Sequence, residues 1–281
     1  EMISAKGFLN GSRLRDAYTD AQPNPEQVVY QLMGSDSESM SKAASILDGR
    51  ICSGIDINMG CPAPHIVKQG AGISWMYKPD SAFELVKIVR DKVKNHALSV
   101  KIRTGPENDY QYLRDFCFGL VDAGVDRITV HPRTAKQKLK RKADWSYITR
   151  LVNDIPIPVW GNGDISSVDN LKKRAQGKYD GLVIGRAAVQ QPWIFAAAKG
   201  LVTGPINRQS VILQYLEYLQ KFLPAELHRS RIALFFEIFL TQFVWGHRLN
   251  TLVARQKEID QIVSVINQYF ERYPDEKIIQ L

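Results

Sequence analysis

A cysteine follows a predicted strand in the segment DINMGCPAPH, which spans residues 56–65. A structural cysteine normally lies within an apolar run, where it packs as a small hydrophobic residue. Cys61 instead lies between Gly60 and Pro62, where the backbone turns and a side chain can meet a ligand. A thiol of ordinary acidity is mostly protonated at neutral pH and can donate a proton, whereas a nucleophilic thiol needs a base nearby. Cys61 is therefore a candidate general acid, and Asn58 offers an amide that can read a carbonyl and N–H edge.

Cationic side chains end two other predicted strands. In VKIRTG, Lys101 and Arg103 alternate with aliphatic residues, so they share one face of the strand. A buried cation is costly unless it meets an anion or an electron-rich ring. These two residues therefore contact a ligand or lie solvated at the mouth of the fold. VHPRT places His131 and Arg133 on one face in the same way, and His131 is open to a structural or a ligand-binding interpretation.

Two glycine-containing segments, GNGDI at 161–165 and IGRAA at 184–188, end the last two predicted strands. Glycine lets backbone N–H groups approach an anion closely, and Arg186 can bind the anion with two hydrogen bonds. In a (βα)8 barrel the phosphate site follows strands seven and eight, which is where these segments fall. Each segment alone is also typical of a turn. Together they predict a phosphate-bearing cofactor.

Strand and helix patterns alternate along the chain and must position these residues. Amphipathic segments at Asp80–Val93 and Gln111–Ala123 separate short apolar runs, which predicts a parallel sheet with helices outside it. At least five strands end in polar or glycine residues, so we expect an α/β (βα)8 TIM barrel. A doubly wound sheet would concentrate function at one or two strand ends. The expected strands are Val28–Met33, Ile51–Ile57, Leu98–Ile102, Arg127–His131, Pro158–Trp160 and Gly181–Ile184.

The strand count and the C-terminal pattern divide the chain further. With the opening EMIS as a strand end the count reaches seven, one short of a closed barrel, so we expect that a first βα unit is missing. Near residues 202–207 the alternation stops, and helical spacing continues through Arg231–Phe243 and Val253–Phe270. We expect a catalytic barrel over 1–204 and a small all-α helical domain over 205–281.

Composition limits the partners. The 281 residues carry a formal net charge of +8 and a sequence pI near 9.3, which favours a nucleic-acid partner. Three cysteines without a CxxC spacing and five histidines without ligand spacing predict neither a disulfide framework nor a metal site. Neither a signal peptide nor a membrane-spanning apolar run is visible. We therefore expect a cytoplasmic protein, monomeric, with no membrane or metal partner.

Taken in order, these motifs resemble those of the tRNA-dihydrouridine synthases, bacterial type. EMISAKG, DINMGCP, VKIRTG, VHPRT, GNGDI and IGRAAVQQPWIF follow the family's order across about residues 1–200, and a helical C-terminal domain is also typical of the family. The family's first flavin-binding strand, of the form APM, is missing. GAGISWMYKP replaces the usual GAGSALL or GAGGALL, and HPRT replaces HGRT. These departures bear on fine substrate specificity.

The resemblance implies flavin-dependent reduction of specific tRNA uridines to 5,6-dihydrouridine, with FMN as cofactor and NADPH as reductant. Hydride would pass from N5 of reduced FMN to C6 of uracil, and Cys61 would protonate C5. Asn58, Arg103 and Arg133 would face the uridine. The residues that would bind FMN are Gln31, Lys101, His131, Asn162, Gly163, Asp164, Gly185 and Arg186.

Two alternatives remain open. A small-molecule FMN barrel, like dihydropyrimidine or dihydroorotate dehydrogenase, would use a similar site but needs neither the positive charge nor the helical domain. A non-catalytic RNA-binding barrel would not need Cys61, Lys101 and Arg186 together. The basic segment 135–145 is either a solvated loop or a tRNA phosphate contact.

Overall fold

The computed structural model describes residues 2–11, 15–137 and 141–281. Lys138 and Lys140 of the basic segment therefore lie outside the described residues. The chain forms two compact units. The first comprises residues 1–164 and 175–183, and the second comprises 165–174 and 184–281. The expected functional division at residue 204 stays a prediction. The second compact unit also includes residues 165–174 and 184–204.

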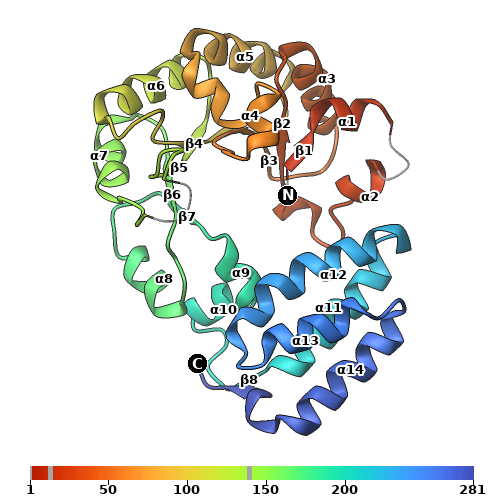
Figure 1. The fold of residues 1–281 in the computed structure, drawn as a ribbon. Helices are drawn as coiled ribbons and strands as arrows, with labels where there is room; N and C mark the ends of the chain where they lie inside the picture. The colour runs from red at the N-terminus through yellow and green to blue at the C-terminus, as the bar shows by residue number, and fades with distance from the viewer. Residues whose placement is uncertain (1, 12–14, 138–140) are drawn as a thin grey trace. The chain divides into compact units, whose positions relative to one another are not determined.

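The first unit is built on a seven-stranded parallel sheet (Figure 1). The strands are hydrogen-bonded in their order along the chain, from β1 to β7, with every neighbouring pair parallel. A doubly wound sheet reverses its strand order at a switch point, and this sheet does not reverse. The prediction of a barrel-like α/β fold is confirmed. The strands are β1 (Met2–Ser4), β2 (Val29–Met33), β3 (Gly54–Met59), β4 (Leu98–Arg103), β5 (Arg127–His131), β6 (Val159–Asn162) and β7 (Gly181–Val183).

Helices connect these parallel strands, and α3, α5, α6 and α7 run along the outer side of the sheet in Figure 1. Aspartate side chains begin two of them: Asp36 accepts the Ser39 N–H at 2.8 Å, and Asp109 accepts the Tyr112 N–H at 3.2 Å. The helices expected at Asp80–Val93 and Gln111–Ala123 are α5 and α6, each displaced by one residue. The helices of this unit are α1 (Ala5–Leu9), α2 (Arg15–Thr19), α3 (Ser37–Asp48), α4 (Pro64–Lys68), α5 (Pro79–Lys92), α6 (Tyr110–Asp122) and α7 (Ser146–Asp154).

The two faces of the sheet differ in chemistry. Successive side chains of a strand point to opposite faces, so alternate residues form two separate surfaces. The outer surface is aliphatic and fully buried, with Ile55, Ile57, Val100, Ile102 and Val130 all at 0% exposure. A Cβ added at Gly161 would lie 2.4 Å from the Trp145 ring, so the outer face of β6 packs tightly against the start of α7. The polar residues of the strands therefore face inward.

One strand prediction was wrong at its start. Ile51 was expected to begin a buried strand, but it is 71% exposed and β3 begins only at Gly54. Pairing explains the difference, because β2 begins at Val29 and its register partner is Gly54. Pairing with β4, in which Met59 is the register partner of Ile102, extends β3 to Met59, two residues beyond the expected end. The strand thus runs almost to the Cys61 turn.

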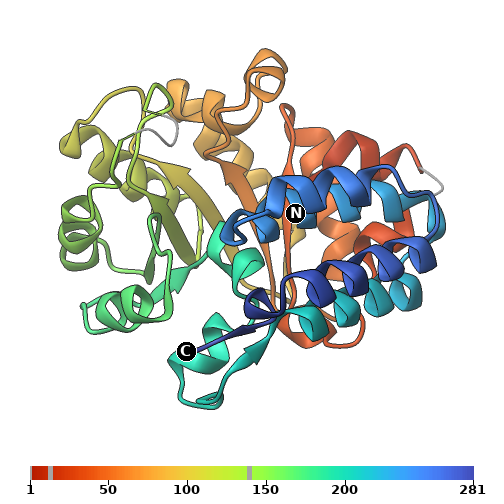
Figure 2. The same cartoon turned by 60° about the horizontal axis from the view of Figure 1, so that its bottom comes forward.

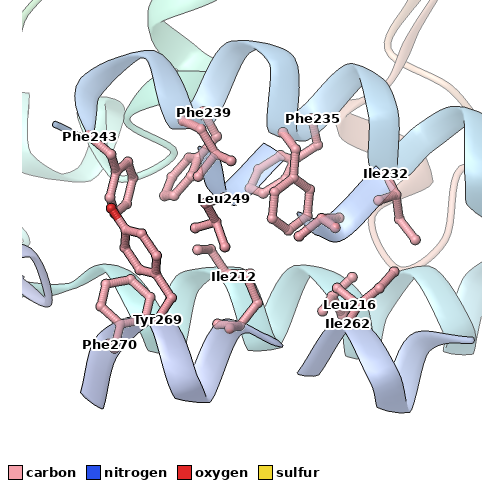
Figure 3. Packing of buried hydrophobic residues seen from close by; sticks show 14 of the residues in the cluster. Ile212, Leu216, Ile232, Phe235, Phe239, Phe243, Leu249, Ile262, Tyr269 and Phe270 are labelled. Atoms are coloured by element: carbon pink, nitrogen blue, oxygen red, sulfur yellow. The ribbon is translucent and has the colours of Figure 1, made fainter. Parts of the chain in front are cut away.

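The second unit is helical, with a core of aromatic and aliphatic residues from α11, α12, α13 and α14 (Figure 3). Phe236 and Phe239 are at 0% exposure there, and the Phe235 and Phe239 rings stack at 4.8 Å. Two short strands, β8 (Ile206–Asn207) and β9 (Ile278–Ile279), pair antiparallel near the C-terminus (Figure 2). The helices are α8 (Val168–Ala175), α9 (Arg186–Gln190), α10 (Ile194–Ala198), α11 (Arg208–Phe222), α12 (Ala225–Phe239), α13 (Gly246–Ala254) and α14 (Ile259–Arg272).

The helical spacing predicted too much continuity here. Val253–Phe270 was expected to be one helical stretch, but α13 ends at Ala254 and α14 begins at Ile259. Glu258 and Gln261 form a capping box, which satisfies backbone N–H groups at a new helix start. Likewise, α12 ends at Phe239, before the expected Phe243. Throughout the described chain, no helix combines the length and apolarity needed to span a membrane.

Candidate active site

The inward face of the sheet carries a hydrogen-bonded polar layer. Gln31, Asp56, Ser99 and Arg127 are register partners on four successive strands. The Asp56 carboxylate accepts Gln31 Nε2 at 2.6 Å and Ser99 Oγ at 2.5 Å. Arg127 donates to Ser99 Oγ at 3.3 Å and its guanidinium lies 4.0 Å from the Trp160 ring centroid. Burial raises the pKa of Asp56, against the opposing effects of these hydrogen bonds and of nearby cations.

A second polar layer lies one step further along the strands, with Asn58, Lys101 and Thr129 as register partners. Lys101 has no hydrogen-bond or ion-pair partner among the described residues. Burial lowers the pKa of Lys101 to about 8, while the charge of Asp56 opposes that shift. An ammonium group with free donors at the centre of a polar face is available to a ligand.

A third layer ends the strands and is strongly cationic. Arg103 pairs in register with His131, and both side chains are buried. Burial, together with the charges of Arg103, Lys101 and Arg133, lowers the pKa of His131 to about 3. Arg133 Nη1 lies 3.0 Å from His131 Nε2. Since a guanidinium only donates, Nε2 is the acceptor and the neutral ring carries its proton on Nδ1.

Asp164 joins the ends of β5 and β6. Its carboxylate accepts Arg133 Nη2 and the Ala143 N–H, both at 2.6 Å. Although burial opposes ionisation, these hydrogen bonds and the Arg133 charge lower the pKa of Asp164. Asp164 has a φ of 53°, in the left-handed region that aspartate tolerates better than most residues. Asp164, which the sequence predicted to bind phosphate, thus holds the turn that follows β5 through these two hydrogen bonds.

Hydrogen bonds to backbone groups hold the turn at Cys61. Asn58 Oδ1 accepts the N–H of Gly60 at 3.2 Å and that of Cys61 at 2.9 Å. Arg103 Nε donates to the Gly60 carbonyl at 2.9 Å, and the Cys61 carbonyl accepts the Ile73 N–H at 3.1 Å. The Cys61 side chain is partly buried and packs against an apolar cluster of Met33, Ile66 and Ala71.

The predicted phosphate segments fall in different units. Asn162 ends β6 in the first unit and Gly163 follows it, and Asn162 Nδ2 donates to the Val183 carbonyl at 2.7 Å. Gly185 and Arg186 begin α9 in the second unit, and both are exposed. A Cβ added at Gly185 would meet nothing within 4 Å, so there is open space beside its backbone.

Sequence reasoning missed Asp56, Ser99 and Arg127 of the first polar layer. The signal was present, because an aspartate within the apolar run GIDINM is unusual for a buried strand. It also missed Gly72, whose φ is +60°. A Cβ there would lie 2.5 Å from the Cys61 carbonyl oxygen, so only glycine fits against the turn. In the unusual GAGISWMYKP segment, Trp75 Nε1 donates to the Gly34 carbonyl at 2.9 Å, so this bulky side chain is part of the scaffold.

A family model matches residues 1–269 of the chain, and its description is dihydrouridine synthase (Dus). The chain belongs to the dihydrouridine synthase family. A probable tRNA-dihydrouridine synthase of Aquifex aeolicus is 29% identical over 280 residues, covering 97% of this chain and 87% of that protein. One from Treponema pallidum is 31% identical over 213 residues, covering 72% of this chain and 63% of that protein.

The family also includes longer proteins. A tRNA-dihydrouridine(47) synthase-like protein of Homo sapiens is 33% identical over 201 residues, which is 71% of this chain and 31% of that protein. A Xenopus tropicalis protein with the same name is 31% identical over 201 residues, again 31% of its length. The chain thus matches about a third of these vertebrate dihydrouridine synthase relatives and most of the Aquifex one.

Proposed function

We propose that the protein reduces specific uridines of tRNA to 5,6-dihydrouridine, using FMN and, as reductant, NADPH. The observation that carries the proposal is the Lys101 ammonium, which has no hydrogen-bond or ion-pair partner among the described residues. It lies on a polar barrel face in register with Asn58, three residues before Cys61. Family membership supports the reaction class. We place this activity in the cytoplasm.

The donor set of the polar face fits the polar edge of a flavin, which offers carbonyl oxygens and one ring N–H. The N–H donors of Lys101 bond to no other residue in the described part of the chain. Gln31 has one N–H and one oxygen lone pair left after its bonds to Asp56 and Asn58. We propose that Lys101, Gln31 and neutral His131 hold the ring system. Asn162, Gly163, Asp164, Gly185 and Arg186 would hold the ribityl phosphate, with Asp164 acting by keeping the turn after β5 in place.

In the proposed reaction the flavin, when bound and reduced, supplies the hydride that reaches C6 of uracil. Cys61 donates the proton to C5, because hydrogen bonds on both sides of its backbone fix the position from which its thiol departs. Cys61, Lys101 and Arg103 are close enough for their charges to interact. The cations would stabilise the thiolate that remains after the proton leaves.

We further propose that Asn58, Arg103 and Arg133 lie on the uridine side of the site. Arg103 and Arg133 are 5% and 3% exposed and hold the carbonyls of Thr134 and Arg141. Their guanidinium groups are thereby fixed at the strand ends, where they can attract an anionic RNA segment. A uridine within folded RNA must leave its stack to reach such a pocket.

The charge distribution suggests where tRNA is held. Residues 1–204 carry 28 Lys and Arg against 21 Asp and Glu, whereas residues 205–281 carry nine against eight. Residues 135–145 carry five Lys and Arg against one Asp. We propose that this basic segment contacts the phosphate backbone, and that the helical domain 205–281 recognises the shape of the tRNA.

The test is to delete the gene, map dihydrouridine in total tRNA, and restore the gene on a plasmid. The proposal expects loss of dihydrouridine at one or a few tRNA positions and its return on complementation. An unchanged dihydrouridine map would overturn the tRNA assignment. A small-molecule dehydrogenase would instead reduce or oxidise free pyrimidines in vitro and leave the tRNA map intact.

A further inference from the structure

The peptide group that joins Gly60 to Cys61 is held at both ends. Its N–H, on Cys61, donates to Asn58 Oδ1 at 2.9 Å. Its carbonyl, on Gly60, accepts Arg103 Nε at 2.9 Å. A peptide group is planar and rigid, so two bonds of this kind fix the plane from which the Cys61 side chain departs.

The Asn58 amide has only one possible orientation. Its oxygen faces two backbone N–H groups, of Gly60 and Cys61, so its NH2 group must point the other way. There it donates to Gln31 Oε1 at 2.9 Å. Gln31 must then direct its own NH2 group to Asp56, where the distance is 2.6 Å. The Cys61 backbone, Asn58, Gln31 and Asp56 therefore form one directional chain of hydrogen bonds.

We propose that Asn58 is a positioning residue for Cys61, which forms a side-chain turn over the Cys61 N–H and connects that turn to the Gln31 amide. This inference rests on the proposed role of Cys61 as the proton donor. It goes beyond the proposed place of Asn58 on the uridine side, because two protein N–H groups occupy the Asn58 oxygen and only its NH2 group is left to face the base. Asn58 is 6% exposed, which agrees with an internal role.

Replacing Asn58 by serine distinguishes the two contacts of its side chain, the one with the Cys61 turn and the one with Gln31. A serine hydroxyl can form the same kind of turn with N–H groups two and three residues ahead, but it is too short to reach the partner of an asparagine NH2 group. Asn58→Ser should therefore keep the Cys61 turn and lose the contact with Gln31, whereas Asn58→Ala should lose both. Asn95→Ala is the control, because Asn95 is exposed and donates to the Asp48 carboxylate, away from the Cys61 turn.

Iodoacetamide alkylation of Cys61 in the full chain, followed by mass spectrometry, measures the turn without needing turnover. Cys52 and Cys117 are buried and provide internal references. We expect alkylation of Cys61 to become several-fold faster in Asn58→Ala, and to stay near the wild-type rate in Asn58→Ser and Asn95→Ala. In turnover, kcat should fall by about 10- to 100-fold in Asn58→Ala, with KM little changed, and recover substantially in Asn58→Ser.

Equal losses in the serine and alanine variants, appearing mainly in KM, would overturn the inference and favour uridine reading. A wild-type alkylation rate in Asn58→Ala would also overturn it. If the alanine variant fails to fold, amide hydrogen exchange of the wild-type protein decides: the Cys61 N–H should be protected, and fast exchange contradicts the proposal. If wild-type protein forms no dihydrouridine, the proposed function fails while the alkylation and exchange results still test the turn.

Discussion

Arg133 and Asp164 form a partly buried ion pair, with 2.6 Å between Nη2 and Oδ1, that joins the ends of β5 and β6. Asp164 also holds the Ala143 N–H, and Arg133 holds the Arg141 carbonyl, so the segment after β5 is attached at both of these points. The same guanidinium donates to His131. This ion pair therefore fixes the segment after β5, the neutral His131 ring and the end of β6 relative to one another.

His131 should make the protein less stable in mild acid. Its pKa is about 3 in the folded state, against about 6.5 when unfolded, so between these values the unfolded chain binds the extra proton. Stability should thus fall as pH decreases from about 6.5 toward 3, by at most about 1.4 kcal/mol per pH unit from this group. Urea unfolding across this range should show a shallower slope in His131→Gln. An exposed-site control, His65→Gln, should keep the wild-type slope, and identical slopes in all three would contradict the prediction.

Lys101 should make FMN binding sensitive to alkaline pH. The Lys101 pKa of about 8 means that the ammonium loses its proton above that pH, and with it a charged donor for the cofactor. The Kd for FMN, measured by fluorescence quenching, should rise between pH 7 and pH 9. Lys101→Arg stays charged and should flatten this rise, whereas Lys101→Met should bind weakly at both pH values. The prediction fails if the arginine variant and wild type show the same pH dependence.

Cys61→Ala should abolish dihydrouridine formation and leave FMN bound, because the thiol donates a proton and is not among the proposed flavin contacts. Dihydrouridine content of treated tRNA and the flavin absorbance of the same preparation measure the two effects. Cys52→Ala is the matched control and should retain activity, since Cys52 precedes β3 at the opposite end from the Cys61 turn. Turnover at the wild-type rate in Cys61→Ala would remove the thiol from the mechanism.

Replacing Lys136, Arg141 and Lys142 together by alanine should weaken tRNA binding and reduce its salt dependence. All three side chains are exposed, and the Arg141 contact with Arg133 uses the backbone carbonyl, so the fold should survive. The slope of log K against log salt should fall by about 2–3 in magnitude if all three contact phosphate. The control replaces Lys87, Lys92 and Lys94, which removes the same charge from α5 and the residues after it. Equal slopes for the two triple variants would favour a solvated loop.

Phe236→Ala should destabilise the helical unit by about 3–5 kcal/mol, because it leaves a cavity in a close-packed aromatic core. Phe236 is at 0% exposure, while Leu234, on the same helix, is 50% exposed. Leu234→Ala should therefore change stability by less than about 1 kcal/mol, and the pair separates core packing from helix propensity. Thermal unfolding of both variants provides the measurement, and similar melting temperatures would contradict the burial of Phe236 in this core.

The sequence predicted the fold class because its signals are local. Alternation of aliphatic and polar residues in VKIRTG specifies a strand with two unlike faces, and periodic apolar residues specify α5 and α6. Element ends were less predictable. The break between α13 and α14 depends on the Glu258 and Gln261 capping box, and the start of β3 depends on where β2 begins.

By itself the sequence determined the order of strands and helices, the candidate residues at strand ends, and the excess of positive charge. Only the tertiary structure decided that Lys101 and Arg103 point inward and that Asp56 lies on the same face of the sheet. It also decided that the Asn58 side chain accepts a hydrogen bond from the Cys61 backbone. The physical reason is that a residue's type and spacing specify which face of an element it occupies. Its hydrogen-bond partners, and hence its charge state and orientation, come from strands that are distant in the chain and meet only when the sheet forms.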